Sequence, residues 1–208
     1  MTKTFLHVGC GQSYKAQTTS VFNTAEWNEV RLDIDPNCHP DITCSMYDMD
    51  TIEDNTYDAI YSSHNIEHVF PHEVIDTLIE FRRVLKDDGF LILTCPDIKA
   101  VCERIGEGKI SERLYNSPAG DIYPLDILYG HRSSIASGHE HMAHKNGFTS
   151  ESLQAHITKS NYKSFIVGEA KSSFALWLMA YKNVIVSKPV MERDLKCHIL
   201  KPSKDNDG

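Results

Sequence analysis

Two stretches near the start of the chain combine residue types and a spacing that suit the binding of a nucleotide-like ligand. An apolar run at residues 5–8 ends in the glycine turn 9–11, and about twenty residues later a second run, 30–36, carries Asp33 and Asp35. Glycines that follow a buried strand let the backbone turn sharply and approach a ligand closely. A carboxylate at the end of the next strand can accept both hydroxyls of a ribose. The two stretches therefore predict a site for an adenosine-type cofactor.

Histidines gather in a further stretch, residues 131–144. His139, His141 and His144 have the spacing His-x-His-x-x-His, which neutral imidazoles can use to bind a metal ion such as Zn²⁺. No cysteine joins them at ligand spacing, and close histidines on an irregular loop often face solvent or brace the loop. We therefore expect no metal here. We favour a surface that contacts an anionic or hydroxylated substrate through His131, Arg132, His139 and His144.

The composition limits the partners of the protein. Its 208 residues include 21 basic and 29 acidic side chains, a formal charge of −8. This balance argues against nucleic acid or an anionic membrane as partner, because either would need a basic surface. No apolar run approaches the ~20 residues that span a bilayer, no signal-peptide pattern is present, and none of the six cysteines forms a Cys-x-x-Cys pair. We expect a cytoplasmic protein without disulfides.

Apolar runs alternate with helical patterns through roughly the first hundred residues, which predicts an α/β fold with a doubly wound, mostly parallel sheet. Strands are expected at 5–8, 30–36, 42–44, 57–63, 90–94, 164–169 and 174–181, and helices from about 71 to 85, at 98–105 and from Thr149 or Ser150 onward. The last two strands are adjacent and predict an antiparallel pair at the end of the sheet. Residues 1–190 should form a single domain with a frayed tail at 191–208, and an irregular insertion at 106–147 should serve as a lid or substrate-binding segment.

Four motifs stand in order along the chain, at residues 9–11, 32–36, 57–68 and 80–90. Together they resemble the class I S-adenosylmethionine-dependent methyltransferases, and more narrowly those with a methyltransferase type 11 domain, over residues 4–97. The resemblance implies a Rossmann-like sheet of seven strands, six parallel and the last antiparallel. It also implies S-adenosylmethionine at the carboxyl ends of the first strands, and transfer of its methyl group to a small-molecule acceptor.

The resemblance assigns cofactor contacts to individual positions. Gly9 and Gly11 match the turn beneath the methionine portion, and Asp33 matches the acid that accepts the ribose hydroxyls, with Asp35 a weaker candidate. Ile34 matches the apolar residue against adenine. The full set implied is Gly9, Cys10, Gly11, Gln12, Asp33, Ile34, Ser45, Met46, Ser63 and His64.

The sequence departs from the pattern of the family in three ways. His7 replaces an acid that precedes the first glycine and serves recognition of the cofactor's amino group. Gln12 and Ser13 stand where a third glycine often occurs, so we expect a short or displaced helix after the turn. Ser45 stands where an aspartate usually accepts from the adenine amino group, so adenine should be selected less strictly or through backbone and water contacts.

Histidine is suited to act as the base for a weakly acidic acceptor at neutral pH. The resemblance places the strand end at Ser63 and His64 beside the reactive methyl group, so His64 is the first choice for this role. His68, one helical turn further on, is the second. The alternative for His68 is structural, since Glu67 and His68 can simply cap or brace the helix that follows.

Other functions remain open at this point. An NAD(P)-dependent oxidoreductase would share the glycine turn and the ribose acid, but residues 9–11 lack the third spaced glycine of that class. A cofactor-binding module without catalysis is the other alternative, because His7 and Ser45 depart from the family. A monomer or a homodimer fits the sequence equally well, and the methyl acceptor is not identified.

Overall fold

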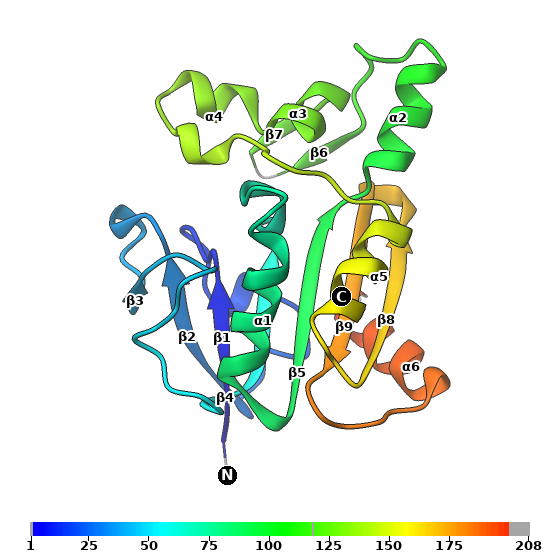
Figure 1. Ribbon diagram of the computed structural model, residues 1–208. Helices are drawn as coiled ribbons and strands as arrows, with labels where there is room; N and C mark the ends of the chain where they lie inside the picture. Colours follow the sequence, from blue (N-terminus) through cyan, green and yellow to red (C-terminus); the bar gives the residue numbers. More distant parts are fainter. Residues whose placement is uncertain (1, 118, 200–208) are drawn as a thin grey trace, which may run out of the picture.

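A seven-stranded sheet forms the centre of the protein in the computed structural model, which describes residues 2–117 and 119–199 (Figure 1). Its strands are β1 (Lys3–Val8), β2 (Trp27–Asp33), β3 (Ile42–Thr43), β4 (Tyr57–Ser63), β5 (Leu85–Pro96), β8 (Ser164–Ala170) and β9 (Ala175–Tyr181). They lie in the order β3-β2-β1-β4-β5-β9-β8. All neighbouring pairs are parallel except those that β9 makes with β5 and β8. The predicted doubly wound sheet with one reversed strand is confirmed.

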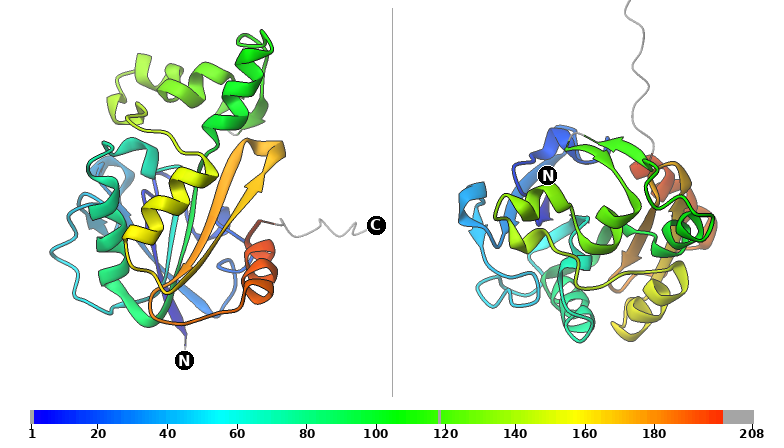
Figure 2. Two further views of the ribbon diagram at one scale, coloured as in Figure 1. Left: turned by 45° about the vertical axis from the view of Figure 1, so that its right-hand side comes forward. Right: turned by 90° about the horizontal axis from the view of Figure 1, so that it is seen from above.

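Helices cover both faces of this sheet. Helix α1 (Val74–Val84) and helix α5 (Ser150–Lys159) pack side by side on one face, and α6 (Lys188–Ile199) lies against β8 and β9 on the other (Figure 2). Leu78 and Phe81 of α1 and Leu153 of α5 are fully buried in the larger core. Phe22 and Trp27 belong to the smaller core on the opposite face. The cores hold the strand ends rigid where the glycine turn and the acids stand.

The start of β5 differs from the sequence prediction. The strand begins at Leu85, directly after α1, so the residues between the expected helix and the expected strand at 90–94 lie inside it. Leu85 pairs with Tyr57 while Phe90 pairs with Ala59, so the residues between them form a bulge against β4. A Cβ on Gly89 would lie only 3.0 Å from the Lys86 carbonyl oxygen, which explains the glycine. A bulge and a turn share such residues, so local sequence does not separate them.

The segment from 98 to 147 forms a cap above the carboxyl ends of the strands, and its labelled elements stand together at the top of Figure 1. It contains α2 (Ile98–Gly106), the hairpin β6 (Tyr115–Ser117) and β7 (Gly120–Ile122), α3 (Pro124–Tyr129), α4 (Arg132–Ala136) and the 3₁₀ turn η4 (Glu140–Met142). Val101, Ile122 and Ile127 form a small core of its own. The insertion predicted as irregular at 106–147 is therefore largely made of short elements, too short for a periodic pattern to show.

The predicted tail at 191–208 is wrong for its first part. Residues 191–199 belong to α6, and Met191, Leu195 and His198 are buried against the sheet and the segment before β2. His198 Nδ1 lies 2.9 Å from Thr19 Oγ1 and its ring packs against Phe22. Helix α6 is rich in charged residues, so its three buried positions leave a weak apolar pattern. Residues 200–208 lie outside the described part of the chain.

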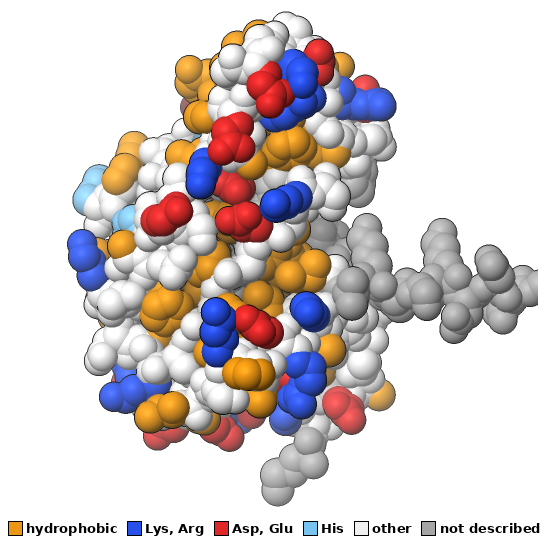
Figure 3. Space-filling view, turned by 90° about the vertical axis from the view of Figure 1, so that its right-hand side faces the viewer, with side chains coloured by type: hydrophobic (Ala, Val, Ile, Leu, Met, Phe, Trp, Pro, Cys, Tyr) orange, Lys and Arg blue, Asp and Glu red, His pale blue; other side chains and the backbone are white. Residues whose placement is uncertain are grey.

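Short 3₁₀ turns complete the fold: η1 (Lys15–Gln17), η2 (Pro36–Cys38), η3 (Ile66–His68) and η5 (Lys171–Ser173). Among the described residues no helix follows β1 directly, and η1 stands in the crossover to β2, as Gln12 and Ser13 predict. No helix of residues 2–117 and 119–199 is long and apolar enough to cross a membrane. On the face around β8 and α6, acidic and basic side chains are intermingled with hydrophobic ones (Figure 3).

Candidate active site

A cavity of about 450 Å³ opens where β1, β2 and β4 end. Parallel sheets bind ligands at this edge, where neighbouring connections diverge to opposite sides. The cavity is lined by every residue that the sequence assigned to the cofactor, namely Gly9, Cys10, Gly11, Gln12, Asp33, Ile34, Ser45, Met46, Ser63 and His64. Its size is within the range of pockets for small molecules and cofactors.

The glycine turn is held from below by Asn65, a residue that the sequence analysis did not single out. Gly9 and Gly11 have φ angles of +62° and +52°, which favour glycine. A Cβ on Gly9 would collide with the side-chain amide of Asn65. Asn65 Nδ2 donates to the carbonyl oxygen of Val8 at 2.9 Å and to that of Ser63 at 3.1 Å. Asn65 thus ties the ends of β1 and β4 together beneath a turn with room for a ligand.

Asp33 lies at the end of β2 with only 9 % of its surface exposed. Its Oδ2 accepts from the backbone N–H of Gly11 at 2.7 Å, and its Oδ1 accepts from the N–H of Asp35 at 2.9 Å. A carboxylate has about four acceptor positions, so these two bonds orient the group and leave capacity for a ligand. Next to it, Ile34 is 60 % exposed on the cavity wall, where an apolar ring can cover it.

Arg31 braces the outer side of the same turn and was also missed. Its side chain is buried and donates to the carbonyl oxygens of Gly11 at 2.6 Å, Ser13 at 3.0 Å and His39 at 2.8 Å. A single guanidinium therefore joins the turn after β1 to the turn after β2. Its partners are backbone atoms distant in sequence, so no motif marks it.

His7 does not line the cavity. It is buried in β1, where its Nδ1 lies 2.7 Å from Glu29 Oε1. The other oxygen of Glu29 accepts from the N–H of Lys15 at 2.8 Å. Where the family pattern has an acid, this chain has a histidine paired with an acid from the neighbouring strand.

Cys10 and Cys95 are buried, and burial raises the pKa of the Cys10 thiol to about 11. Burial also raises the pKa of the Cys95 thiol, so both remain protonated at neutral pH and act as small apolar residues.

A second cavity, of about 200 Å³, lies between the cap and the sheet. It is lined by His64, Glu67, His68, Pro96, Tyr115, Ala119, Ile122, Asp126, Ile127, His131, Ser134, Met142 and His144. His64, His68 and Met142 also line the first cavity, so the two spaces meet at these side chains. His64 has a left-handed φ of +55°, a conformation that places a non-glycine residue under strain and is often found at functional sites.

The four residues predicted for substrate contact divide into two pairs. His131 and His144 line the second cavity. Arg132 instead binds Asp126, with Nε 2.8 Å from Oδ1, and braces α3 against α4. His139 is exposed and contacts Ser137, so neither Arg132 nor His139 lines these two cavities.

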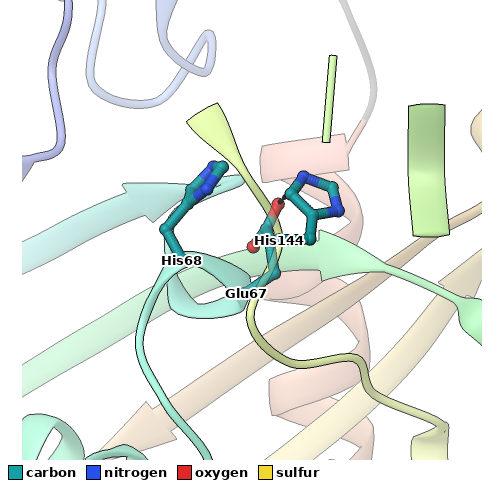
Figure 4. Close-up of side chains that lie close together, drawn as sticks. All are labelled: Glu67, His68 and His144. Atoms are coloured by element: carbon teal, nitrogen blue, oxygen red, sulfur yellow. Dashed lines mark ion pairs between the residues drawn. The ribbon is translucent and has the colours of Figure 1, made fainter. Parts of the chain in front are cut away.

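Glu67 lies at the centre of the histidines and is 1 % exposed (Figure 4). Its Oε1 is 3.5 Å from His64 Nδ1 and 3.9 Å from His144 Nε2, yet neither carboxylate oxygen has a hydrogen-bond partner. Burial opposes ionisation of Glu67, but His64 and the other imidazoles outweigh it and lower the pKa of the carboxyl. The structural alternative, in which Glu67 and His68 only cap or brace the following helix, therefore does not account for a buried charged group on the wall of a cavity.

The strand order, the glycine turn and the cavity above it define the S-adenosylmethionine-dependent methyltransferase fold of class I. Solved structures with the same fold include a protein from Pyrococcus horikoshii OT3, 14 % identical, with a TM-score of 0.58 over 87 % of this chain and 82 % of that chain. A SAM-dependent methyltransferase from Archaeoglobus fulgidus is 9 % identical, with a TM-score of 0.55 over 86 % of each chain. A third is the Burkholderia thailandensis 1,6-didemethyltoxoflavin-N1-methyltransferase, 12 % identical, with a TM-score of 0.54 over 88 % of this chain and 72 % of that chain.

Residues 6–93 match the sequence model of the family described as "Methyltransferase domain". No curated protein sequence matches the chain. The methyltransferase match over residues 6–93 and the shared fold therefore support methyl transfer as the activity and S-adenosylmethionine as the cofactor. The oxidoreductase alternative has no support in the family match.

Proposed function

We propose that this enzyme transfers the methyl group of S-adenosylmethionine to a small-molecule acceptor held in the second cavity. The observation that carries the proposal is the junction of the two cavities at His64, His68 and Met142. An acceptor beneath the cap then lies next to a cofactor above the glycine turn, which is the proximity that methyl transfer requires.

The volume and the lining of the first cavity support its assignment to the cofactor. We assign the methionine portion to the turn at Gly9 and Gly11, the ribose hydroxyls to Asp33, and the adenine to Ile34 and Ser45. When bound, S-adenosylmethionine supplies a methyl group on a sulfonium, which is open to in-line displacement. The hydrogen bonds from the N–H groups of Gly11 and Asp35 hold the Asp33 carboxylate in place before a ligand arrives. Little of the binding energy of the cofactor is therefore lost to ordering of this side chain.

A small acceptor is supported by the size and lining of the second cavity. A volume of about 200 Å³ holds one small ring or the end of a chain. Ile122, Ile127 and Met142 give it an apolar wall, while His131 and His144 offer hydrogen bonds to an anionic or hydroxylated group. The Burkholderia thailandensis neighbour is described with 1,6-didemethyltoxoflavin and S-adenosylhomocysteine bound, which provides a small-molecule precedent on this fold.

We propose that His64 is the general base, which takes the proton that the acceptor loses when it is methylated. Its side chain is 43 % exposed, lies at the junction of the cavities and contacts Glu67, which can orient the ring. A base that is partly open to water can pass its proton on after each turnover. His68 is the second choice, with its Nδ1 3.1 Å from the Ala143 carbonyl oxygen. We further propose a cytoplasmic location, supported by six free thiols, of which Cys102 and Cys197 are exposed.

Filling the second cavity tests where the acceptor binds. Ala119 lies exposed at its rim, so Ala119→Trp should lower kcat/KM for a small acceptor at least about tenfold through steric exclusion, with S-adenosylhomocysteine affinity unchanged. Acceptors are first found by release of S-adenosylhomocysteine across a panel of small hydroxylated and carboxylated molecules. Ala136→Trp, on an exposed residue of α4 outside both cavities, is the control.

Two results would refute this proposal. Equal activity of Ala119→Trp and the parent enzyme would remove the acceptor from the second cavity. Turnover with a protein or nucleic-acid acceptor, and with none of the small molecules, would refute the acceptor class. Cofactor binding without turnover of any acceptor would favour the silent module.

A further inference from the structure

Three side chains that can each offer a metal-ligand atom lie close together on the wall of the second cavity. They come from Glu67 and His68 on η3 and from His144 in the cap, and each residue offers one ligand atom within 4.8 Å of the other two (Figure 4). Among the residues that the structure describes, this is the group whose types and spacing suit a metal ion. We infer that Glu67, His68 and His144 form a binding site for a divalent transition-metal ion, with Zn²⁺ as the expected occupant.

The hydrogen bonds of the two histidines engage Nδ1 in each ring and leave Nε2 as the atom that can bind a metal ion. His68 Nδ1 lies 3.1 Å from the carbonyl oxygen of Ala143, and His144 Nδ1 lies 2.7 Å from that of Ile127. A carbonyl oxygen can only accept, so each Nδ1 carries the proton and each neutral ring has its lone pair on Nε2. Backbone carbonyls orient metal-binding histidines in this way in many proteins.

Glu67 supplies the negative charge of the site. Its buried oxygens without hydrogen-bond partners are a second, independent observation that points to a bound cation. Glu67 is 1 % exposed, and neither of its oxygens has a hydrogen-bond partner. A buried carboxylate without a hydrogen bond is costly, and its contact with His64 Nδ1, at 3.5 Å, is too long to satisfy it fully. A cation among the three groups would satisfy all of them at once.

The donor set selects the kind of metal. Two imidazoles and one carboxylate suit Zn²⁺ and similar first-row ions, whereas Mg²⁺ and Ca²⁺ prefer oxygen ligands. Three protein ligands leave a fourth position open, and all three line the second cavity. That position can take an oxygen of the acceptor, a hydroxyl or a carboxylate, so this inference also rests on the proposed function when it assigns a role to the metal.

The cap is attached to the sheet at this place. The backbone N–H groups of Lys145 and Asn146 donate to the Glu67 carbonyl oxygen at 2.8 and 3.1 Å. His144 therefore reaches the site on a segment already fixed to η3, although it follows Glu67 by more than seventy residues. A metal ion would add a further link between cap and sheet, and so should raise the thermal stability of the protein.

Metal binding is tested on the full chain without any acceptor. Protein stripped with a chelator is titrated with ZnCl₂ by calorimetry, and with CoCl₂ by visible absorption, which reports coordination geometry. One Zn²⁺ per chain is expected, with affinity reduced at least about a hundredfold in Glu67→Gln and in His144→Ala, and with the Co²⁺ absorption lost. His156→Ala is the matched control, because His156 is also half-buried with its Nδ1 bonded to a carbonyl, that of Ser152, but lies away from the site.

Binding of S-adenosylhomocysteine separates this inference from the proposed function, because Glu67 and His144 do not line the first cavity. Glu67→Gln should keep that binding, which also shows that the variant is folded. Absence of stoichiometric Zn²⁺ binding by the parent protein would overturn the inference. Unchanged Zn²⁺ affinity in both variants would overturn it too, since surface histidines would then be the ligands.

Discussion

Replacement of Asp33 by alanine is expected to weaken the binding of S-adenosylhomocysteine at least about a hundredfold. Two hydrogen bonds from ribose hydroxyls to a carboxylate contribute about 1.5–3 kcal/mol each, and each 1.4 kcal/mol corresponds to a factor of ten in affinity. The same change removes the acceptor that fixes the N–H groups of Gly11 and Asp35, so the turn itself loses order. Calorimetric titration of both proteins measures the difference.

Asp35→Ala provides the control for this experiment. Asp35 stands two residues further on, is also acidic, and does not line the first cavity, because its carboxylate accepts from Asn37. Its loss should change the affinity less than about threefold. If Asp33→Ala binds as tightly as the parent protein, or if Asp35→Ala loses as much affinity, the ribose does not lie on Asp33.

His64→Ala is expected to lower kcat for methyl transfer by about 10²–10⁴-fold, the usual contribution of a positioned general base. His64 lines both cavities, and its Nδ1 lies 3.5 Å from Glu67 Oε1, so in the arrangement that we propose its imidazole lies between cofactor and acceptor. The affinity for S-adenosylhomocysteine should fall only slightly, because Gly9, Gly11 and Asp33 remain. Single-turnover rates with a saturating acceptor, together with calorimetry, separate the two effects.

His39 offers a matched control for His64. It is also a histidine with a left-handed backbone, at a φ of +49°, but it is exposed and lines neither cavity. His39→Ala removes the same side chain from the same kind of conformation and should leave kcat unchanged. A full rate in His64→Ala would show that the acceptor needs no base or that His68 supplies it.

The cofactor cavity was predictable from the sequence because its walls come from strand ends. A glycine turn after one apolar run and an acid after the next meet at one edge of a parallel sheet by the geometry of the fold alone. Gly9 and Asp33 therefore lie together in the structure as the spacing predicts, and Ser63 lies with them as the resemblance to the family implies. Ser45 and Met46 follow because β3 is the next strand outward.

The supporting contacts of that cavity were not predictable in the same way. Arg31 and Asn65 act through backbone carbonyls on other strands, and a carbonyl has no sequence signature. An arginine in a strand and an asparagine after one have ordinary alternatives as surface and turn residues. Only the packed fold shows that both side chains serve the glycine turn.

The histidine cluster illustrates a different limit. The spacing of His139, His141 and His144 draws attention to a site within one loop. In the structure the rings of His139 and His141 stay close, with centroids 5.9 Å apart, but only His144 lines the second cavity. His144 joins Glu67 and His68 instead, through a cap whose short elements give no periodic pattern. Metal-ligating residues from distant segments are brought together by the topology of the fold, and the sequence did not predict the topology of the cap.

A crystal structure of the enzyme with S-adenosylhomocysteine tests the central claim most directly. The account predicts density in the first cavity, with the ribose hydroxyls on Asp33, the adenine against Ile34, and the sulfur near Ser63 and His64, facing the second cavity. Density for the ligand elsewhere, or a sulfur directed away from the second cavity, would contradict the proposed arrangement of cofactor and acceptor.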